Sequence, residues 1–280
     1  MTLAYFNGKI VDIDEPVIPI DERGHQFGDG VYEVIRFYGK KPFMLKEHIE
    51  RLYTSAKAIK LNIGKEPAEM ESLMMELVEK SGLEDADLYM QATRGIAPRN
   101  HLFPKAPASI SMTVKPARQM DEEVKQKGAK VLLLEDERWQ NCYIKSLNLL
   151  PNILAKQEAY ENGCTEAVLV RDGFITEGSS SNIFMVKDSQ VYTAPLSNHI
   201  LAGITRLAVK EVAHELNISF VEESFTTAAF YQADEAFLTS TSSEVLPITL
   251  ADGKVIGSGK PGPITAKLSK RFTEKTKKTR

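Results

Sequence analysis

The pattern of hydrophobic and polar positions in the first 120 residues predicts helices and strands in mixed order. Runs rich in β-branched and aromatic residues predict strands, and the dipeptide Asn7-Gly8 favours a tight hairpin turn. Apolar positions that recur every three or four residues predict helices. We therefore expect a hairpin formed by 3–6 and 9–11, strands at 31–38, 88–95 and 109–116, and helices at 45–61 and 70–78.

The second half of the chain alternates between the two kinds of element. Two strand pairs are separated by short polar turns, and each of the three helical patterns is followed by a strand pattern. The expected strands are 130–136, 166–178 and 182–194 (each of these two a hairpin), 219–224 and 235–241, and the expected helices are 149–161, 205–216 and 226–234.

These elements predict a mixed α and β (α+β) fold with many antiparallel strand pairs, rather than a doubly wound sheet. A chain of 280 residues exceeds the size of a typical single domain of about 100 to 150 residues, so we expect two domains, 1–120 and 121–280. The polar segment 118–128 has no strong pattern and is interpreted as the linker. The proline-bearing loop 96–107 is long enough to suggest a function.

Composition and charge narrow the class of protein. Apolar residues make up 42% of the chain and charged residues 26%, which is typical of globular proteins, and the net charge of −3 does not favour nucleic acid as a partner. The two cysteines, Cys142 and Cys164, are too few for a disulfide framework or a zinc site. No signal peptide or membrane span is visible, so we expect a cytoplasmic protein without a metal. The basic end, 270–280, is interpreted as a solvated helix end with a frayed tail.

Lys145 is the first candidate for chemistry, because Tyr143, Ile144 and Leu147 around it predict a partly buried position. From this segment alone, a lysine whose ammonium group reaches solvent is the simpler interpretation. The alternative is a lysine that forms a Schiff base, because burial lowers the pKa of an amine and frees it to attack an aldehyde.

A second group of candidates lies at turns and at a helix start. Glu177 stands among small hydroxyl residues in TEGSSSN, where a carboxylate is able to keep a pyridine ring protonated. Gly203, Ile204 and Thr205 open the predicted helix at 205–216, and the free N–H groups of such a start attract phosphate. Ser240, Thr241 and Ser242 offer further hydroxyl donors at a strand end. Taken singly, a surface carboxylate, a capped helix and a plain turn explain these residues equally well.

Three basic residues complete the set of candidates. Arg51, which lies near His48 on the first predicted long helix, carries a guanidinium group suited to phosphate. Arg99 and His101 lie two residues apart in the long loop, so an extended backbone points both to one side, where they are able to bracket a carboxylate. Solvated side chains are the default interpretation of each.

Considered in order along the chain, these segments resemble the fold-type IV pyridoxal-phosphate aminotransferases, and among them the enzymes specific for D-amino acids. The ordered series is far more specific than any single motif, and it spans nearly the whole chain. The segments are 23–38, 47–56, 94–104, 144–159, 176–182 and 203–206.

The resemblance implies a two-domain fold and a cofactor, pyridoxal 5'-phosphate. A smaller N-terminal α/β domain would bind the substrate carboxylate, and a larger, barrel-like C-terminal α/β domain would bind the cofactor. The reaction implied is transfer of the amino group of a D-amino acid such as D-alanine to 2-oxoglutarate, giving D-glutamate and a 2-oxo acid. Because the Arg-x-His loop of this family reaches into the neighbouring subunit's site, a homodimer is also implied.

The resemblance also assigns roles to residues. Lys145 would hold the cofactor through a Schiff base and then move the proton of the substrate's Cα. Glu177 would pair with the pyridine nitrogen, and Leu201 would pack against the ring. Tyr32, Arg99 and His101 would bind the α-carboxylate, which fixes the face of Cα presented to the lysine. The residues implied around the phosphate are Arg51, Ile204, Thr205, Ser240 and Thr241.

Three alternatives stay open. Arg36 occupies a position where branched-chain L-amino-acid aminotransferases also carry arginine, but Val34 stands where those enzymes typically have glycine. An aminodeoxychorismate lyase would share Lys145 and would release pyruvate instead of transferring nitrogen. A non-catalytic binding protein with the same fold is disfavoured because Lys145 and Glu177 are both present.

Overall fold

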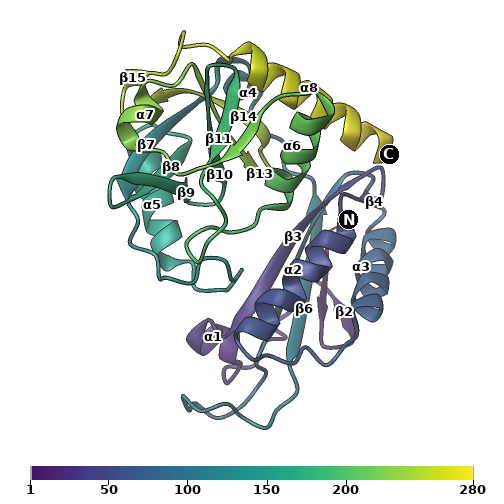
Figure 1. Ribbon diagram of the computed structural model, residues 1–280. Coiled ribbons are helices and arrows are strands. Elements are labelled where there is room, and N and C mark those ends of the chain that lie inside the picture. Colours follow the sequence, from purple (N-terminus) through teal and green to yellow (C-terminus); the bar gives the residue numbers. More distant parts are fainter. Residues whose placement is uncertain (1, 280) are drawn as a thin grey trace. The chain divides into compact units, whose positions relative to one another are not determined.

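The computed structural model describes residues 2–279, with side chains up to residue 277, and divides the chain into two compact units (Figure 1). Unit 1 comprises Met1–Arg118, Ile144–Asn148 and Thr276–Arg280, and unit 2 comprises Gln119–Tyr143 and Leu149–Lys275. The short segment Ile144–Asn148, which includes Lys145, thus belongs to unit 1 although its chain neighbours on both sides belong to unit 2. Each unit is described below by itself.

Unit 1 is an antiparallel sheet of six strands with two long helices on one face (Figure 1). The strand order is β2-β1-β6-β5-β3-β4. The strands are β1 (Leu3–Phe6), β2 (Lys9–Val11), β3 (Gly30–Tyr38), β4 (Lys41–Pro42), β5 (Ala86–Thr93) and β6 (Ser109–Pro116). The helices are α1 (Arg23–Phe27), α2 (Leu45–Ala58) and α3 (Pro67–Ser81).

Side-chain alternation along β3 places its core residues on the face that α2 covers. Val31, Ile35 and Phe37 are fully buried there, with Leu52 of α2 packed in the same cluster. Glu33 shares this face because it stands at the same period, and it too is fully buried. The sheet therefore places one carboxylate among apolar residues, and that carboxylate needs a charged partner.

Unit 2 is a curled, mostly antiparallel sheet in the order β12-β11-β10-β13-β14-β7-β8-β9, with β15 beside β14. The parallel pairs are β11 with β12, β14 with β7, and β7 with β8. The strands are β7 (Ala129–Glu135), β8 (Glu166–Arg171), β9 (Phe174–Gly178), β10 (Asn182–Lys187), β11 (Gln190–Thr193), β12 (Phe220–Glu222), β13 (Glu235–Ser240), β14 (Glu244–Ala251) and β15 (Lys254–Val255). The helices are α4 (Glu122–Lys127), α5 (Leu150–Glu161), α6 (Ile204–Glu215), α7 (Thr227–Tyr231) and α8 (Pro263–Thr279).

The structure confirms the predicted mixed α and β class and the type of each predicted element, and it adds elements that the sequence pattern did not reveal. Asn7 and Gly8 form the expected hairpin turn with positive φ angles of 45° and 96°. β14 and the short β15 were not predicted. α8 continues to Thr279, so the predicted fraying is absent up to that residue, and Arg280 lies outside the described residues.

Two short helices lie where loops were expected, and both are defined by polar contacts. α4 occupies the predicted linker, with the Asp121 carboxylate accepting a hydrogen bond from the Glu123 N–H at 2.7 Å. It buries no residue, so no apolar period marks it. α1 begins after Glu22, whose carboxylate accepts from the His25 N–H at 2.9 Å, and ends at Gly28 with φ 64°.

The helices of the described residues differ from membrane-spanning helices. Within residues 2–279, none combines the length and the apolar character that are needed to cross a bilayer.

Candidate active site

Lys145 lies on a short extended segment that pairs with the start of β3. β4 pairs only with Phe37 and Tyr38 of β3, so the first residues of β3 have no strand partner on that edge. The Tyr32 N–H donates to the Lys145 carbonyl at 3.0 Å, and the Lys145 N–H donates to the Ser55 hydroxyl of α2 at 3.1 Å. Both backbone polar groups of Lys145 are thus held by unit 1.

The side chain of Lys145 is half-buried, as its surroundings in the sequence predict. Its Nζ atom lies 4.3 Å from the centroid of the Tyr32 ring, a cation–π contact. Tyr32 in turn stacks on Tyr89 with the two centroids 5.8 Å apart. Burial, together with the nearby Tyr32, raises the pKa of Tyr89 to about 12, so Tyr89 stays uncharged at neutral pH.

Arg51 lies in a buried charged cluster with Glu33 and His48, and the sequence reasoning missed Glu33. The Arg51 guanidinium donates two hydrogen bonds to the two oxygens of Glu33, each at 2.7 Å, and His48 Nδ1 lies 2.8 Å from Glu33 Oε2. Burial opposes ionisation of Glu33, but the charge of Arg51 and the hydrogen bonds from Arg51 and His48 outweigh this effect and hold its pKa far below the usual range. Glu33 stands at the same alternating positions of β3 as the buried apolar residues, and this pattern was the sequence signal for a buried carboxylate.

Arg99 and His101 lie on the loop between β5 and β6 and contact the same aromatic ring. Arg99 Cζ is 4.6 Å from the centroid of Phe27, at the end of α1, and the His101 ring is 5.6 Å from that centroid. Both side chains are exposed. The two side chains therefore point to one side, although the backbone bends at both residues instead of running extended as predicted.

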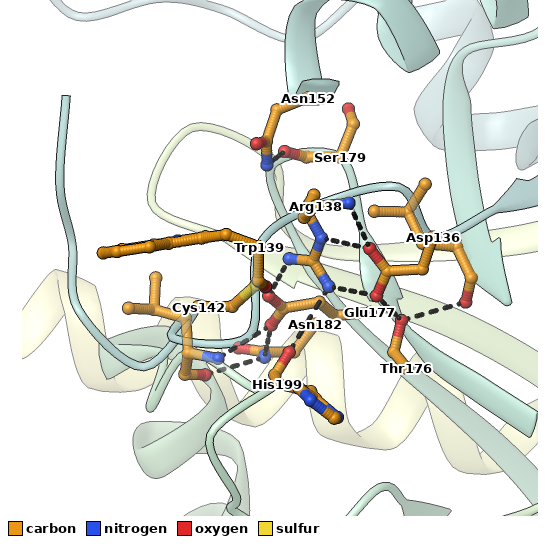
Figure 2. A network of polar contacts seen from close by, with 12 residues as sticks. Asp136, Arg138, Trp139, Cys142, Asn152, Thr176, Glu177, Ser179, Asn182 and His199 are labelled. Carbon is orange, nitrogen blue, oxygen red and sulfur yellow. Dashed lines mark hydrogen bonds and ion pairs between the residues drawn. The ribbon is translucent and has the colours of Figure 1, made fainter. Parts of the chain in front are cut away.

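Glu177, at the end of β9 in unit 2, is the centre of the polar network in Figure 2. It is 5% exposed. Arg138 donates to its Oε1, the Asn182 amide donates to its Oε2 at 3.1 Å, and the Leu201 N–H donates to the same oxygen at 3.0 Å. Burial raises the pKa of Glu177, and Arg138 opposes this shift, so the arginine decides how far the carboxylate stays ionised.

Arg138 is itself clamped by a second carboxylate, as Figure 2 shows. Its Nε and Nη2 atoms each lie 2.8 Å from an oxygen of Asp136. The Thr176 hydroxyl donates to Asp136 at 2.9 Å. Burial opposes the charge of Asp136, but Arg138 and Thr176 together lower its pKa. The sequence reasoning missed Arg138 and Asp136, although the Asp-x-Arg spacing directly after a strand was a signal for the pair.

The start of α6 lies against the same network. Asn182, which donates to Glu177, also donates to the Leu201 carbonyl at 3.0 Å. Gly203 precedes α6 and has no side-chain cap, and a Cβ atom built on it would lie only 2.1 Å from Asn182 Oδ1. Only glycine lets the backbone approach this closely. Glu177, Leu201 and the helix start are thereby brought together as one group.

The residues at the helix start fit a phosphate group. Ile204 and Thr205 are both buried, and the N–H groups of the first helical turn lack a capping side chain. Thr239 of β13 pairs with Asn182 of β10, and its hydroxyl is buried without a hydrogen-bond partner among the described residues. Uncapped donors and a buried unpaired hydroxyl in one region are the arrangement that a bound anion would satisfy.

Ser240 and Thr241 follow Thr239 at the end of β13. The Ser240 hydroxyl accepts a hydrogen bond from the Ser243 N–H at 3.0 Å, which holds the turn into β14. Of the predicted site residues, Lys145, Tyr32, Arg51, Arg99 and His101 thus lie in unit 1, and Glu177, Leu201, Ile204, Thr205, Ser240 and Thr241 lie in unit 2.

Comparisons with known proteins identify the family of the chain. The model of the family described as amino-transferase class IV matches residues 30–251. The chain is 44% identical to a D-alanine aminotransferase of Bacillus licheniformis, over 93% of this chain and 92% of that protein. It is 42% identical to a D-alanine aminotransferase of Staphylococcus aureus (strain N315), over 97% of each chain.

The chain also resembles solved structures of aminotransferases, and these are named for branched-chain amino acids. The T.th. branched-chain amino acid aminotransferase with pyridoxamine 5'-phosphate has a TM-score of 0.91 and 30% identity, covering 99% of this chain and 95% of that one. The branched-chain amino acid aminotransferase from Escherichia coli has a TM-score of 0.88 and 26% identity, covering 97% and 92%. The match of the family model over most of the length, and relatives above 40% identity over nearly the whole chain, show that this protein belongs to the class IV aminotransferases.

Proposed function

We propose that the protein transfers the amino group of a D-amino acid such as D-alanine to 2-oxoglutarate, with pyridoxal 5'-phosphate as cofactor. The observation that carries this proposal is the pair Arg99 and His101, held on one ring, in a chain 44% identical to a protein named D-alanine aminotransferase. Two hydrogen-bond donors at this spacing suit the α-carboxylate that every amino acid and 2-oxo acid presents. Amino acids and 2-oxo acids are the small-molecule partners of the family.

The cofactor would be held by the residues that the resemblance to the family implies. Lys145 would bind its aldehyde, Glu177 its ring nitrogen, and Leu201 would pack against the ring. Pyridoxal phosphate supplies an electron-withdrawing ring that makes the hydrogen on the substrate's Cα acidic. The residues proposed around its phosphate are Arg51, Ile204, Thr205, Ser240 and Thr241.

Lys145 is the proposed proton carrier. A lysine amine accepts a proton only when it is neutral, and its half-buried position limits its contact with water. The Tyr32 ring contacts the amine. The backbone hydrogen bonds of Lys145 to Tyr32 of β3 and Ser55 of α2 fix the position of its Cα atom. The residue is thus held in place while its amine gives and takes the proton of Cα.

Glu177 is proposed to keep its negative charge beside the ring nitrogen. Three donors surround the carboxylate: Arg138, Asn182 and the Leu201 N–H. Hydrogen bonds to the charged form favour ionisation, so they counter the effect of burial. Stereochemistry would follow from Tyr32, Arg99 and His101, because binding the α-carboxylate on one side determines which face of Cα meets Lys145.

A branched-chain L-amino-acid aminotransferase is the second candidate, because the solved structures with TM-scores near 0.9 carry that name. Arg36 is the residue that the sequence shares with those enzymes. Here its Nε donates to Asp87 at 2.5 Å and its Nη2 to the Arg118 carbonyl at 3.0 Å. The relatives named D-alanine aminotransferase are 44% and 42% identical to this chain, against 30% and 26% for these two structures, which favours the D-specific proposal.

A comparison of amino donors tests the proposal. D-Alanine, D-aspartate and L-leucine are supplied one at a time with 2-oxoglutarate and pyridoxal phosphate, and each 2-oxo acid product is measured. We expect pyruvate from D-alanine at a rate far above the L-leucine reaction. Faster turnover of L-leucine would support the branched-chain alternative. Release of pyruvate from aminodeoxychorismate would indicate a lyase, and cofactor binding without any turnover would indicate a binding protein.

We also propose that the enzyme works as a cytoplasmic homodimer. α5 carries an apolar stripe that faces solvent in the single chain, formed by residues at helical spacing: Leu150, Ile153, Leu154 and Tyr160, each between 59% and 74% exposed. A second copy is the proposed cover, since the Arg-x-His loop of this family acts across subunits.

Both cysteines are free thiols, which suits a reducing compartment.

A further inference from the structure

Helix α1, which the sequence pattern did not predict, contacts the loop that carries Arg99 and His101 (Figure 1). We propose that two residues of this helix, Arg23 and Phe27, are positioning residues that hold the carboxylate-binding pair in place. The inference rests on the proposed function, because it assigns Arg99 and His101 to the substrate carboxylate. It adds two residues that touch neither substrate nor cofactor.

Arg23 holds the backbone between Arg99 and His101. It is 3% exposed, and its Nη1 donates to the carbonyl of Asn100, the residue between Arg99 and His101, at 2.5 Å. Fixing the carbonyl of Asn100 restrains the backbone from which the side chains of Arg99 and His101 extend, and both of these side chains contact Phe27.

Phe27 supports the two side chains themselves. Its ring lies 4.6 Å from the guanidinium carbon of Arg99 and 5.6 Å from the ring of His101. The guanidinium carbon of Arg23 lies 4.7 Å from the same ring. One phenyl group thus contacts both members of the pair and the arginine that holds their backbone.

Asp29 and Arg94 support this arrangement. Asp29 accepts hydrogen bonds from Arg23 Nε and from Arg94 Nε, each at 2.9 Å. Arg94 also donates to the carbonyls of Ile59 and Lys60, just after α2, at 2.8 Å and 3.0 Å. The loop is therefore tied through α1 to the end of a long helix, which is a rigid support.

The consequence concerns substrate affinity. Arg99 and His101 are exposed, and exposed long side chains lose rotamer freedom when they bind a carboxylate. A platform that holds them beforehand lowers that cost in the Michaelis complex. Both the amino donor and the 2-oxo acid present an α-carboxylate, so loss of the platform affects both half-reactions alike.

The test compares Phe27→Leu and Arg23→Lys with the wild-type holoenzyme. We expect KM for D-alanine and KM for 2-oxoglutarate each to rise by about tenfold, kcat to stay within about threefold, and the cofactor absorbance to be unchanged. Discrimination between D-alanine and L-alanine should fall as well. Phe27→Tyr keeps an aromatic ring beside Arg99, so its KM values should stay close to those of the wild-type enzyme.

Asp87→Asn is the matched control. It breaks the Arg36–Asp87 ion pair in the same sheet, where Arg36 is 6% exposed, without touching the loop. The control should lose stability and keep its KM values. Equal KM values in Phe27→Leu, Arg23→Lys and this control would overturn the proposal, as would a fall in kcat alone. Absence of D-alanine turnover in the wild-type enzyme would instead refute the proposed function.

Discussion

The charge of Glu177 depends on the side chains around it. A carboxyl group that is 5% exposed resists ionisation, and the guanidinium of Arg138 is the charge that opposes this effect. Asp136 shares the same guanidinium and is also buried, so two carboxylates depend on one arginine. At the scale of single residues, a predicted site residue is therefore controlled by one that was not predicted.

Glu177→Gln should lower kcat by about a hundredfold, the scale typical for the loss of one aligned electrostatic contact in an active site. The amide has nearly the same shape and is still able to accept from the Leu201 N–H, so cofactor affinity should change little. Steady-state kinetics and cofactor titration measure the two effects. An unchanged kcat would remove Glu177 from the proposed mechanism.

Arg138→Met should destabilise the protein by about 3 to 5 kcal/mol, because it leaves Asp136 and Glu177 buried without their cation. Urea unfolding at pH 7 measures the loss. The double variant Arg138→Met with Asp136→Asn removes one stranded charge and should recover part of the stability. If the double variant is as unstable as the single one, charge is not the cause.

Lys145→Ala should abolish the link to pyridoxal phosphate that borohydride reduces, because no amine remains at the proposed position. Mass spectrometry of the reduced protein locates the link. Lys57→Ala, a change at a solvent-exposed lysine of α2, serves as the control and should keep the link at Lys145. A link found at another lysine of the wild-type protein would refute the assignment.

At the scale of elements, a buried polar cluster joins α2 to β3. His48 and Arg51 extend from one turn of α2 to Glu33 on the strand. Burial lowers the pKa of His48, with the charges of Arg51 and Lys145 adding to this effect and Glu33 opposing it. The histidine is therefore held neutral in the folded protein, although it protonates near pH 6.5 when unfolded.

This difference makes stability depend on pH. Below about pH 6.5 the unfolded chain binds a proton at His48 that the folded protein resists, so the free energy of unfolding should fall as the pH drops. His48→Gln should remove about 1 kcal/mol of the fall between pH 7.5 and 5.5. Urea unfolding across that range measures it. Parallel pH profiles for the two proteins would show that His48 titrates normally.

At the scale of the whole molecule, the apolar stripe on α5 is the feature that a single chain leaves unexplained. Ile153→Asp should shift the protein from dimer to monomer, because the new charge would have to be buried in the interface. Val255→Asp changes another exposed apolar residue of unit 2, on β15, and should leave the assembly intact. Light scattering coupled to gel filtration separates these outcomes. If the Ile153→Asp variant is still a dimer, the stripe on α5 is not the dimer interface.

The local pattern of the sequence was sufficient to predict the helices α2, α3, α5 and α6 and most of the strands, but only the end of α8. The Asn7-Gly8 turn and the helical period of α2 act over a few residues, so the sequence displays them directly. α1 and α4 escaped this reasoning because polar caps at Glu22 and Asp121 define them, and such helices have no long apolar stripe. β14 was also missed.

For the site, the sequence by itself determined which residue types are available and the order of their motifs, which was enough to recognise the family. Only the tertiary structure showed that Glu33 neutralises Arg51, that Arg138 controls Glu177, and that Phe27 supports Arg99. The physical reason is that charge compensation and cation–π contact depend on distances in space. These partners lie between 18 and 72 residues apart in the chain, beyond the reach of any local pattern.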